Sequence, residues 1–319
     1  MLEIIKMTFY RIFQHKIYLL MSIFVTPIVV FGAIFFTNNI ETVKASIAIL
    51  EEENTTIIST KEVKVTRVKE KPEFAELVQG KYDAFLIPKE DGTFEIETVK
   101  GEAFQNKLKS YLQGNEDSFK EKQRGVATNF IGFVTLFILI FCSMLYKFYY
   151  SEKEGINKRI IATKVGFIKY ALSHAIVVFS IVFVPAVLTV FLARATIGFQ
   201  TTVSNLQMVW VLFVLSFLGT AFNLFISAVI KTEANGSLVG AMVIVITTLM
   251  AGSIFDITAG GVANQISNIF PQHTILAYVA ALESGMPANL LSMFGILAFS
   301  LILSFIGITI DRIRIEENY

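Results

Sequence analysis

The chain has 319 residues, of which 54% are hydrophobic and only 17% are charged, and its mean hydropathy is +0.62. About a quarter of the residues in a globular protein are charged, so this composition excludes an ordinary cytosolic enzyme, a disordered chain and a secreted disulfide scaffold. The net charge of +1 provides no basic field for nucleic acid. The single cysteine, Cys142, can form neither an internal disulfide nor a multi-cysteine metal site.

The first 16 residues predict an amphipathic helix that lies along the inner membrane surface. Its apolar face is formed by Leu2, Ile5, Phe9, Ile12 and Phe13. The alternative is that this segment is only the start of the first membrane span. Lys6, Arg11 and Lys16 favour the interfacial helix, because charged side chains are costly within lipid.

Long uncharged stretches predict six membrane-spanning helices, because about 20 apolar residues in a helix cross the hydrocarbon core. The six lie near residues 17–37, 126–146, 170–192, 208–229, 236–255 and 289–310. The first stretch is longer than the core of a signal peptide, so we interpret it as an uncleaved span. Thr26-Pro27 and Pro185 predict kinks in the first and third spans.

Residues 38–125 predict a small α/β domain between the first two spans. Four strands are expected, at Ala45–Leu50, Val63–Val68, Tyr82–Ile87 and Thr93–Val99. Two short helices are expected at Pro72–Gln79 and Phe104–Leu112, each followed by a glycine. Lys and Arg are concentrated in alternate short loops, which places both termini, including the tail 311–319, in the cytoplasm of a cell-membrane protein. The domain is then extracellular.

Residues 257–282, within the segment 256–287, also contain no Asp, Glu, Lys or Arg, but they are too polar for a lipid-facing span. The segment follows Gly252 and contains Gly260, Gly261 and Pro271 among several Asn, Gln and Ser residues. A re-entrant hairpin shielded by protein fits this composition better than a seventh span.

The sequence contains none of the common catalytic motifs, such as a phosphate-binding P-loop, H-E-x-x-H, C-x-x-C or G-x-S-x-G. The three histidines, His15, His174 and His273, lie far apart, and we expect them near the membrane interfaces. No Asp, Glu, Lys or Arg lies deep in a predicted span, which argues against an ion-coupled carrier and against a channel with a charged ring.

Mild polar residues do occur within the predicted spans. Ser216, Thr220, Asn223 and Ser227 recur on one face of the fourth span, and Asn129 lies in the second. Two interpretations are open: these side chains form hydrogen bonds between helices, or they line a substrate path.

The loop 147–169, between the second and third spans, is the most charged of the predicted cytoplasmic loops. It contains Glu152, Glu154, Gly155, Lys158 and Arg159, and a short helix near residues 156–162 would present the two cations to a soluble partner. The alternative is a solvated loop that obeys the positive-inside rule. That rule explains the cations but not the two glutamates.

In its order of spans, external domain, charged loop and hairpin, the chain resembles the permease subunit of the type-2 ABC exporter family. The resemblance is to the subgroup with an external domain after the first span. Glu152, Glu154 and Gly155 match a charged motif that precedes the coupling helix in that family, although Ile156 replaces the usual Thr. Gly252 and Pro271 match the glycine and proline that flank the family's re-entrant hairpin.

The resemblance implies a mechanism and a set of partners. Two permease subunits, identical or related, would pair above two ABC ATPase subunits, and ATP and Mg would bind on those ATPases. This chain would therefore hold no cofactor and catalyse no hydrolysis itself. Closure of the ATPases would push the coupling helices and switch the permease interface from inward to outward access.

The lack of charge in the spans favours an amphiphilic or hydrophobic cargo, such as a peptide antibiotic or toxin, a drug or a lipid-like molecule. A sodium exporter of the same family is an alternative, which the lack of deep carboxylates disfavours. A receptor that acts through its extracellular domain is a second alternative, although one span would be enough to anchor it. An intramembrane enzyme would need a polar catalytic cluster, and the spans provide none.

Overall fold

The computed structural model describes residues 1–39, 45–50, 63–68, 71, 73–88, 94–114, 124–153, 166–196, 199, 201–230, 232–254 and 262–317. The chain divides into two compact units. The helical unit contains residues 1–38 and 124–319, and the sheet unit contains residues 39–123. Each unit is described by itself.

The N-terminal part of the helical unit begins with α1 (Leu2–Gln14), which packs against α9 (Phe167–Thr196). The buried side of α1 contains Thr8 and Ile12, whereas Leu2 is 67% exposed and Phe13 is 37% exposed. The predicted apolar face therefore points only partly inward. Two of its five members lie on the outside of α1, because the packed face is centred on the row through Thr8 and Ile12.

The backbone changes direction after α1 at His15, and α2 (Lys16–Leu20), the π-helix η1 (Met21–Val25) and α3 (Thr26–Asn39) follow. Pro27 has no N–H, and in a regular helix its ring meets the carbonyl four residues earlier. The π-helical turn lies just before Pro27, and the Thr26 hydroxyl donates to the Met21 carbonyl at 3.4 Å. The irregularity predicted at Thr26-Pro27 is thus a wide turn before the proline. Helix α9 continues through Pro185, and the kink predicted there stays a prediction.

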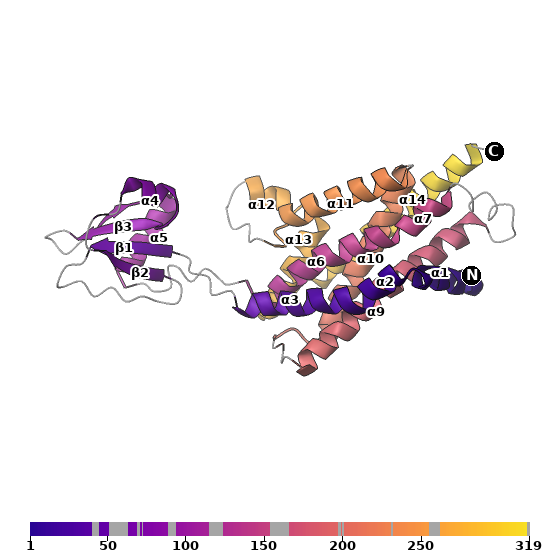
Figure 1. The fold of residues 1–319 in the computed structure, drawn as a ribbon, viewed down its shortest axis with the longest axis horizontal. Coiled ribbons are helices and arrows are strands. Elements are labelled where there is room, and N and C mark those ends of the chain that lie inside the picture. The colour runs from indigo at the N-terminus through magenta and orange to yellow at the C-terminus, as the bar shows by residue number, and fades with distance from the viewer. Residues whose placement is uncertain are drawn as a thin grey trace. The chain divides into compact units, whose positions relative to one another are not determined.

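The rest of the helical unit consists mainly of long apolar helices (Figure 1). They are α6 (Val126–Leu145), α7 (Lys147–Lys153), α9, α10 (Asn205–Val229), α11 (Glu233–Met250), α12 (Val262–Ser267), α13 (Pro271–Glu283) and α14 (Leu290–Glu317). In the described part of the chain, five helical stretches are long and apolar enough to cross a membrane, namely Lys16–Phe35, Val126–Tyr150, Phe167–Thr196, Asn205–Val229 and Leu290–Arg314. The chain is therefore a multi-pass helical membrane protein.

The predicted fifth span, 236–255, corresponds to the shorter helix α11, which ends at Met250. Gly252 has a φ of +74°, and the Ser253 N–H donates to the Thr248 carbonyl at 3.1 Å. This left-handed turn terminates the helix about five residues earlier than the apolar pattern predicted, because glycine takes a positive φ at little cost.

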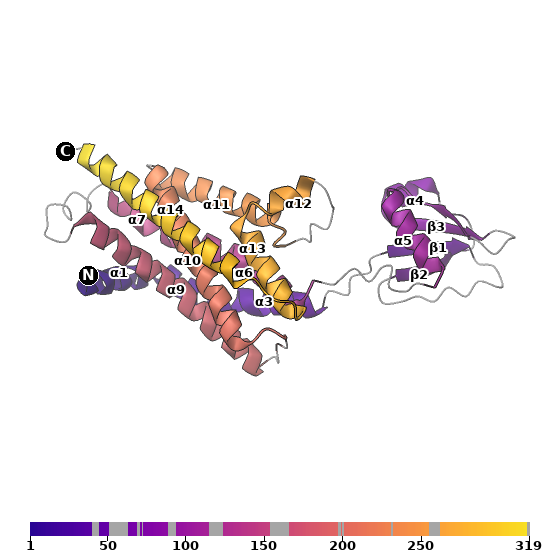
Figure 2. The ribbon, with the colours of Figure 1, turned by 180° about the vertical axis from the view of Figure 1, so that it is seen from behind.

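Helix α10 lies at the centre of the helical unit and packs against α6, α9 and α14. It begins with a capping box, in which the Ser204 hydroxyl accepts from the Gln207 N–H and the Gln207 side chain accepts from the Ser204 N–H. The N-terminal helix α1, helix α7 and the C-terminal end of α14 lie at one end of the helical unit (Figures 1 and 2). The first turn of α6 and the last turn of α13 lie at the other end.

The sheet unit has a four-stranded sheet in the order β2-β1-β3-β4. The strands are β1 (Ala45–Leu50), β2 (Val63–Val68), β3 (Ala84–Pro88) and β4 (Phe94–Glu97); β1 is parallel to β2 and β3, and β4 is antiparallel to β3. The predicted strands are all present, with the third and fourth differing from the predicted limits by one to two residues at each end.

Two helices cover opposite faces of this sheet, α4 (Phe74–Val78) on one and α5 (Glu102–Leu112) on the other. Alternation along β1 explains the arrangement: Ile47 and Ile49 pack with Leu108 of α5, whereas Ala48 packs with Leu77 of α4. A strand buried on both faces reads as a nearly continuous apolar run, as the sequence ASIAIL does, with Ser46 as its one polar residue.

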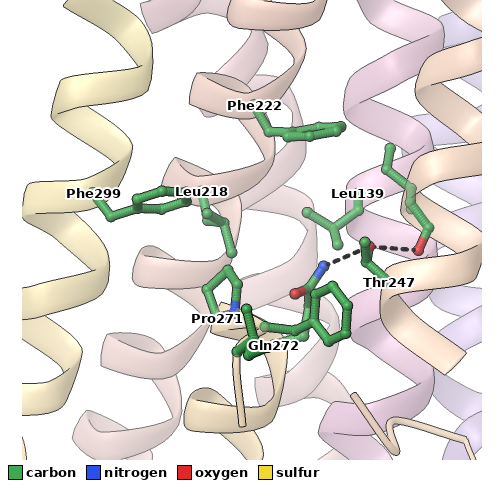
Figure 3. Close-up of a pocket in the computed structure, with 10 residues that line it drawn as sticks. Leu139, Leu218, Phe222, Thr247, Pro271, Gln272 and Phe299 are labelled. Atoms are coloured by element: carbon green, nitrogen blue, oxygen red, sulfur yellow. Dashed lines mark hydrogen bonds between the residues drawn. The ribbon is translucent and has the colours of Figure 1, made fainter. Parts of the chain in front are cut away.

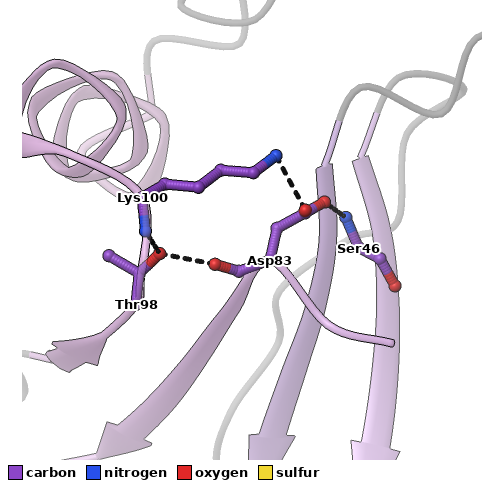
Figure 4. Close-up of polar contacts among 4 residues, drawn as sticks. All are labelled: Ser46, Asp83, Thr98 and Lys100. Carbon is purple, nitrogen blue, oxygen red and sulfur yellow. Dashed lines mark hydrogen bonds and ion pairs between the residues drawn. The ribbon is translucent and has the colours of Figure 1, made fainter. Parts of the chain in front are cut away.

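Asp83 joins the ends of three segments in the sheet unit (Figure 4). Its carboxylate accepts from the Ser46 N–H at 2.7 Å and pairs with the Lys100 ammonium at 2.7 Å. Its carbonyl accepts from the Thr98 hydroxyl at 2.6 Å. Asp83 therefore fastens the start of β3 to the start of β1 and to the segment that follows β4.

Candidate functional site

The predicted coupling residues lie at the border of the described chain. Glu152 belongs to α7, but its side chain is not among those described. Glu154, Gly155, Lys158 and Arg159 lie outside the described residues. The structure does describe the helices from which this loop departs.

The base of the coupling loop is a dense junction of helix ends. The Tyr149 hydroxyl of α7 donates to the Asp311 carboxylate of α14 at 3.1 Å, and Asp311 is 2% exposed. The Arg314 guanidinium donates to the Ala228 carbonyl at 2.6 Å and so caps the C-terminal end of α10. A Cβ at Gly236 of α11 would lie 2.1 Å from the Tyr150 hydroxyl oxygen. Helix α7 is therefore held directly against α11 and bonded to α14.

His174 lies within this junction, enclosed by protein side chains. It is fully buried, and its ring contacts the rings of Tyr146 and Tyr149 at centroid distances of 5.4 and 5.2 Å. His15 lies close by in a different way, with its ring 4.9 Å from that of Phe148. Both histidine rings therefore pack against aromatic side chains, His174 in the interior and His15 on the exposed side.

The opposite end of the helical unit is held by two charged residues that the sequence pattern placed only at span boundaries. The Arg124 guanidinium donates to the carbonyls of Gly252 at 2.6 Å and Ser253 at 3.2 Å, at the end of α11. Arg124 stands directly before α6, so this contact joins the start of α6 to the turn after α11.

Glu283, at the end of α13, caps the N-terminus of α6. Its carboxylate accepts from the backbone N–H groups of Ala127 at 2.7 Å and Thr128 at 2.8 Å, and from the Thr128 hydroxyl at 2.7 Å. The N-cap residue of α6 is Gly125, which has no side chain with which to cap the helix itself. A Cβ at Gly125 would lie 1.9 Å from a Glu283 carboxylate oxygen, so glycine leaves the space that the carboxylate fills.

The predicted hairpin residues are only partly described. Gly252 forms the turn after α11, and Pro271 occupies the first turn of α13, a position where its missing N–H costs nothing. Gly260 and Gly261 lie outside the described residues. The segment thus contains two short helices, α12 and α13, of which α13 carries Glu283 at its end.

The polar row on α10 lies in the interior of the helical unit, where Ser216, Thr220, Asn223 and Ser227 are at most 4% exposed. Thr220 and Ser227 donate to carbonyls of their own helix. Asn223 donates to Gly219 at 2.8 Å and also to the Leu139 carbonyl of α6 at 3.4 Å. Of these contacts, the one from Asn223 to Leu139 joins two helices, and the Ser216 hydroxyl has no hydrogen-bond partner among the described residues. Side chains this buried offer no surface for cargo in this conformation.

Asn129, the other residue predicted for a substrate path, is separate from this row. It lies on the first turn of α6, and its amide donates to the Arg124 carbonyl at 3.4 Å. It therefore belongs to the end of the unit that Arg124 and Glu283 hold together.

Sequence reasoning missed Arg124, Glu283 and the glycines that fit around them. Gly132 is a further example, because a Cβ there would lie 1.9 Å from the Ser253 carbonyl oxygen. The partners are more than 100 positions apart in the chain, so no local pattern could reveal them. The only available signal was that Arg124 and Glu283 border uncharged stretches.

Comparisons with known proteins give the family. Residues 96–275 match the ABC-2 type transporter family, a match that covers more than half of the chain and extends from β4 to α13. A comparison with curated proteins found no match. The resemblance on the loop and hairpin residues thus agrees with the family match, and the chain belongs to the ABC-2 type transporter family.

Proposed function

We propose that this chain is the permease subunit of an ATP-driven exporter that moves an amphiphilic or hydrophobic molecule out of the cell. The match to the ABC-2 type transporter family carries the proposal and makes an ABC ATPase its partner. The permease would pair with a second copy or a related chain, above two ATPase subunits that bind ATP and Mg.

Six crossings with cytoplasmic termini form part of the proposal. Both ends of the described helical unit lie at the same end as α7, as an even number of crossings requires (Figure 1). Helix α11 has 18 residues, a length of about 27 Å at 1.5 Å per residue, which is close to the thickness of a hydrocarbon core. With this topology the sheet unit lies outside the cell, and α12 and α13 form a re-entrant hairpin.

The loop 147–169 is proposed to receive the push of the ATPase. The helix that precedes the loop supports this role, since α7 is hydrogen-bonded to α14 through Tyr149 and lies against α11 at Gly236. A force on the loop would therefore reach two long helices at once. Glu152, Glu154, Gly155, Lys158 and Arg159 would form the docking surface.

The first experiment is purification of the tagged chain from its native membrane in mild detergent, with mass spectrometry of the copurified proteins. A stoichiometric ABC ATPase is the expected result, and a second multi-pass protein would identify a heterodimer. Recovery of the chain alone after crosslinking would refute the proposal and direct attention to the sheet unit.

The docking surface has its own test. Reversing both charges (K158E with R159E) is expected to reduce ATPase association at least tenfold. The matched control reverses Lys64 and Arg67, two exposed cations of β2 in the sheet unit, and is expected to leave association unchanged. Unchanged association and transport in the first variant would remove the coupling role from this loop.

A further inference from the structure

The helical unit contains a cavity of about 210 Å³ between α6, α10, α11, α13 and α14 (Figure 3). Eight of its ten lining residues are apolar, including Leu218 and Phe222 of α10 and Phe299 of α14. An engineered apolar cavity of about 150 Å³ holds benzene. The present cavity is therefore large enough for one ring with a small substituent, or for a branched aliphatic group of similar size.

Gln272 of α13 is the main polar group of this cavity, and it is 6% exposed. Its amide nitrogen donates to the Thr247 hydroxyl oxygen at 3.1 Å. The Thr247 hydroxyl itself donates to the Val243 carbonyl at 2.7 Å, so its only proton is already used. Thr247 can then only accept from Gln272, and this fixes which end of the amide faces Thr247.

The Gln272 amide oxygen consequently points away from Thr247, toward Leu218 and Pro271 (Figure 3). Among the residues that the structure describes, this oxygen has no hydrogen-bond partner. A buried acceptor without a partner is unfavourable. Water alone is a poor solution, since a buried water needs two to four polar partners and this lining is mostly apolar.

We propose that this cavity binds a lipid-soluble molecule with a ring-sized apolar body and one hydroxyl or N–H group, which donates to the Gln272 amide oxygen. The body would contact Leu218, Phe222 and Phe299. Entry is from the apolar outer surface of the helical unit, since Phe299 is 45% exposed and Ile269, which also lines the cavity, is 75% exposed. The proposal does not rest on the export activity proposed above, because binding requires neither ATP nor the ATPase.

The test measures the binding of 4-fluorobenzyl alcohol and of 4-fluorotoluene to the full chain in lipid nanodiscs by fluorine NMR, with empty nanodiscs as the partition reference. The two probes share a ring and differ in the hydroxyl group. After correction for partition, the native chain is expected to bind the alcohol about fivefold more tightly, the factor that one hydrogen bond contributes. Equal binding of the two probes would overturn the proposal.

Two variants locate the site. Gln272→Met keeps the length of the side chain and removes the amide, so the ratio of the two affinities should fall to about one while 4-fluorotoluene binding stays within twofold. Leu218→Trp fills the cavity and should weaken both probes about tenfold, whereas Leu291→Trp, on the exposed face of α14, should change neither. A fivefold preference that survives in Gln272→Met overturns the proposal, whether or not the Leu218 variant folds.

Mass spectrometry and an ATP hydrolysis assay then distinguish two sources of such a ligand, a resident membrane lipid and a transported cargo. A hydroxyl- or amine-bearing lipid that copurifies with the native chain, and not with Gln272→Met, identifies a molecule resident in the membrane. Stimulation of ATP hydrolysis by 4-fluorobenzyl alcohol in the complex, lost in Gln272→Met, identifies cargo.

Discussion

The carboxylate of Glu283 is the cap of α6, and its removal gives the sharpest test of how the helical unit is held together. Glu283→Ala would leave the N–H groups of Ala127 and Thr128 and the Thr128 hydroxyl without the acceptor that they now share. Gly125 cannot replace it, because glycine has no side chain. Glu283→Gln would keep one acceptor oxygen but would turn an NH₂ group toward the N–H donors and lose the charge.

The expected magnitude follows from these contacts. An N-cap contributes about 1 kcal/mol, and a charge at a partly buried helix terminus up to about 2 kcal/mol. Glu283 is half-buried, so solvent weakens the charge effect. We expect a loss of about 2 to 3 kcal/mol for Glu283→Ala and about 1 kcal/mol for Glu283→Gln. At 2 to 4 °C per kcal/mol for a unit of this size, Tm should fall by about 4 to 12 °C in the alanine variant.

Cys142 provides the assay. It is the only cysteine of the chain, is fully buried, and lies on α6, the helix that Glu283 caps. A thiol-reactive dye should therefore become fluorescent only when α6 leaves its neighbours during heating of the purified chain. No engineered residue is needed, because the native cysteine reacts with the dye.

Ser284→Ala is the matched control, because Ser284 is the next residue and its hydroxyl donates only to carbonyls of its own helix. It should lower the free energy of unfolding by less than about 0.5 kcal/mol. If Glu283→Ala and Ser284→Ala gave the same Tm, the capping role of Glu283 would be refuted. If Glu283→Gln lowered Tm as much as Glu283→Ala, the charge, and not the hydrogen bonds, would dominate the effect.

Three further predictions concern other contacts. Gly132→Ala would place a Cβ 1.9 Å from the Ser253 carbonyl oxygen, so it should lower the free energy of unfolding by about 1 to 3 kcal/mol in the Cys142 assay. The control Gly295→Ala, whose Cβ would have nothing within 4 Å, should be neutral or stabilising. Equal effects of the two variants would contradict the close packing of α6 on the turn after α11. Asn223→Ala breaks the bond to Leu139 of α6 and should lower stability by about 1 kcal/mol without changing transport per folded complex; a selective loss of transport would restore the substrate-path interpretation. Asp83→Asn weakens the contacts with Ser46 and Lys100 and should make the sheet unit of the full chain more sensitive to limited proteolysis than Glu73→Gln does; equal cleavage rates would count against the fastening role.

The sequence by itself determined the class of the protein and most of its elements. A lipid-facing helix needs a long uncharged stretch, so the spans can be read without knowing what they contact. The strands of the sheet unit were found for a similar reason, since β1 is buried on both faces and reads as one apolar run. Where the pattern gave the wrong limit, as at the end of α11, a glycine with a positive φ ended the helix within an apolar stretch.

Tertiary structure alone decided how the ends of the helices are held. Glu283 and Ala127 are 156 residues apart, and Arg124 and Gly252 are 128 apart, so each pair exists only because the start of α6 meets the ends of α11 and α13. The orientation of the Gln272 amide likewise depends on Thr247, which belongs to another helix. Hydrophobic periodicity reports the environment of one residue at a time, whereas a cap or a polar cavity depends on which distant groups meet, and that is set by packing.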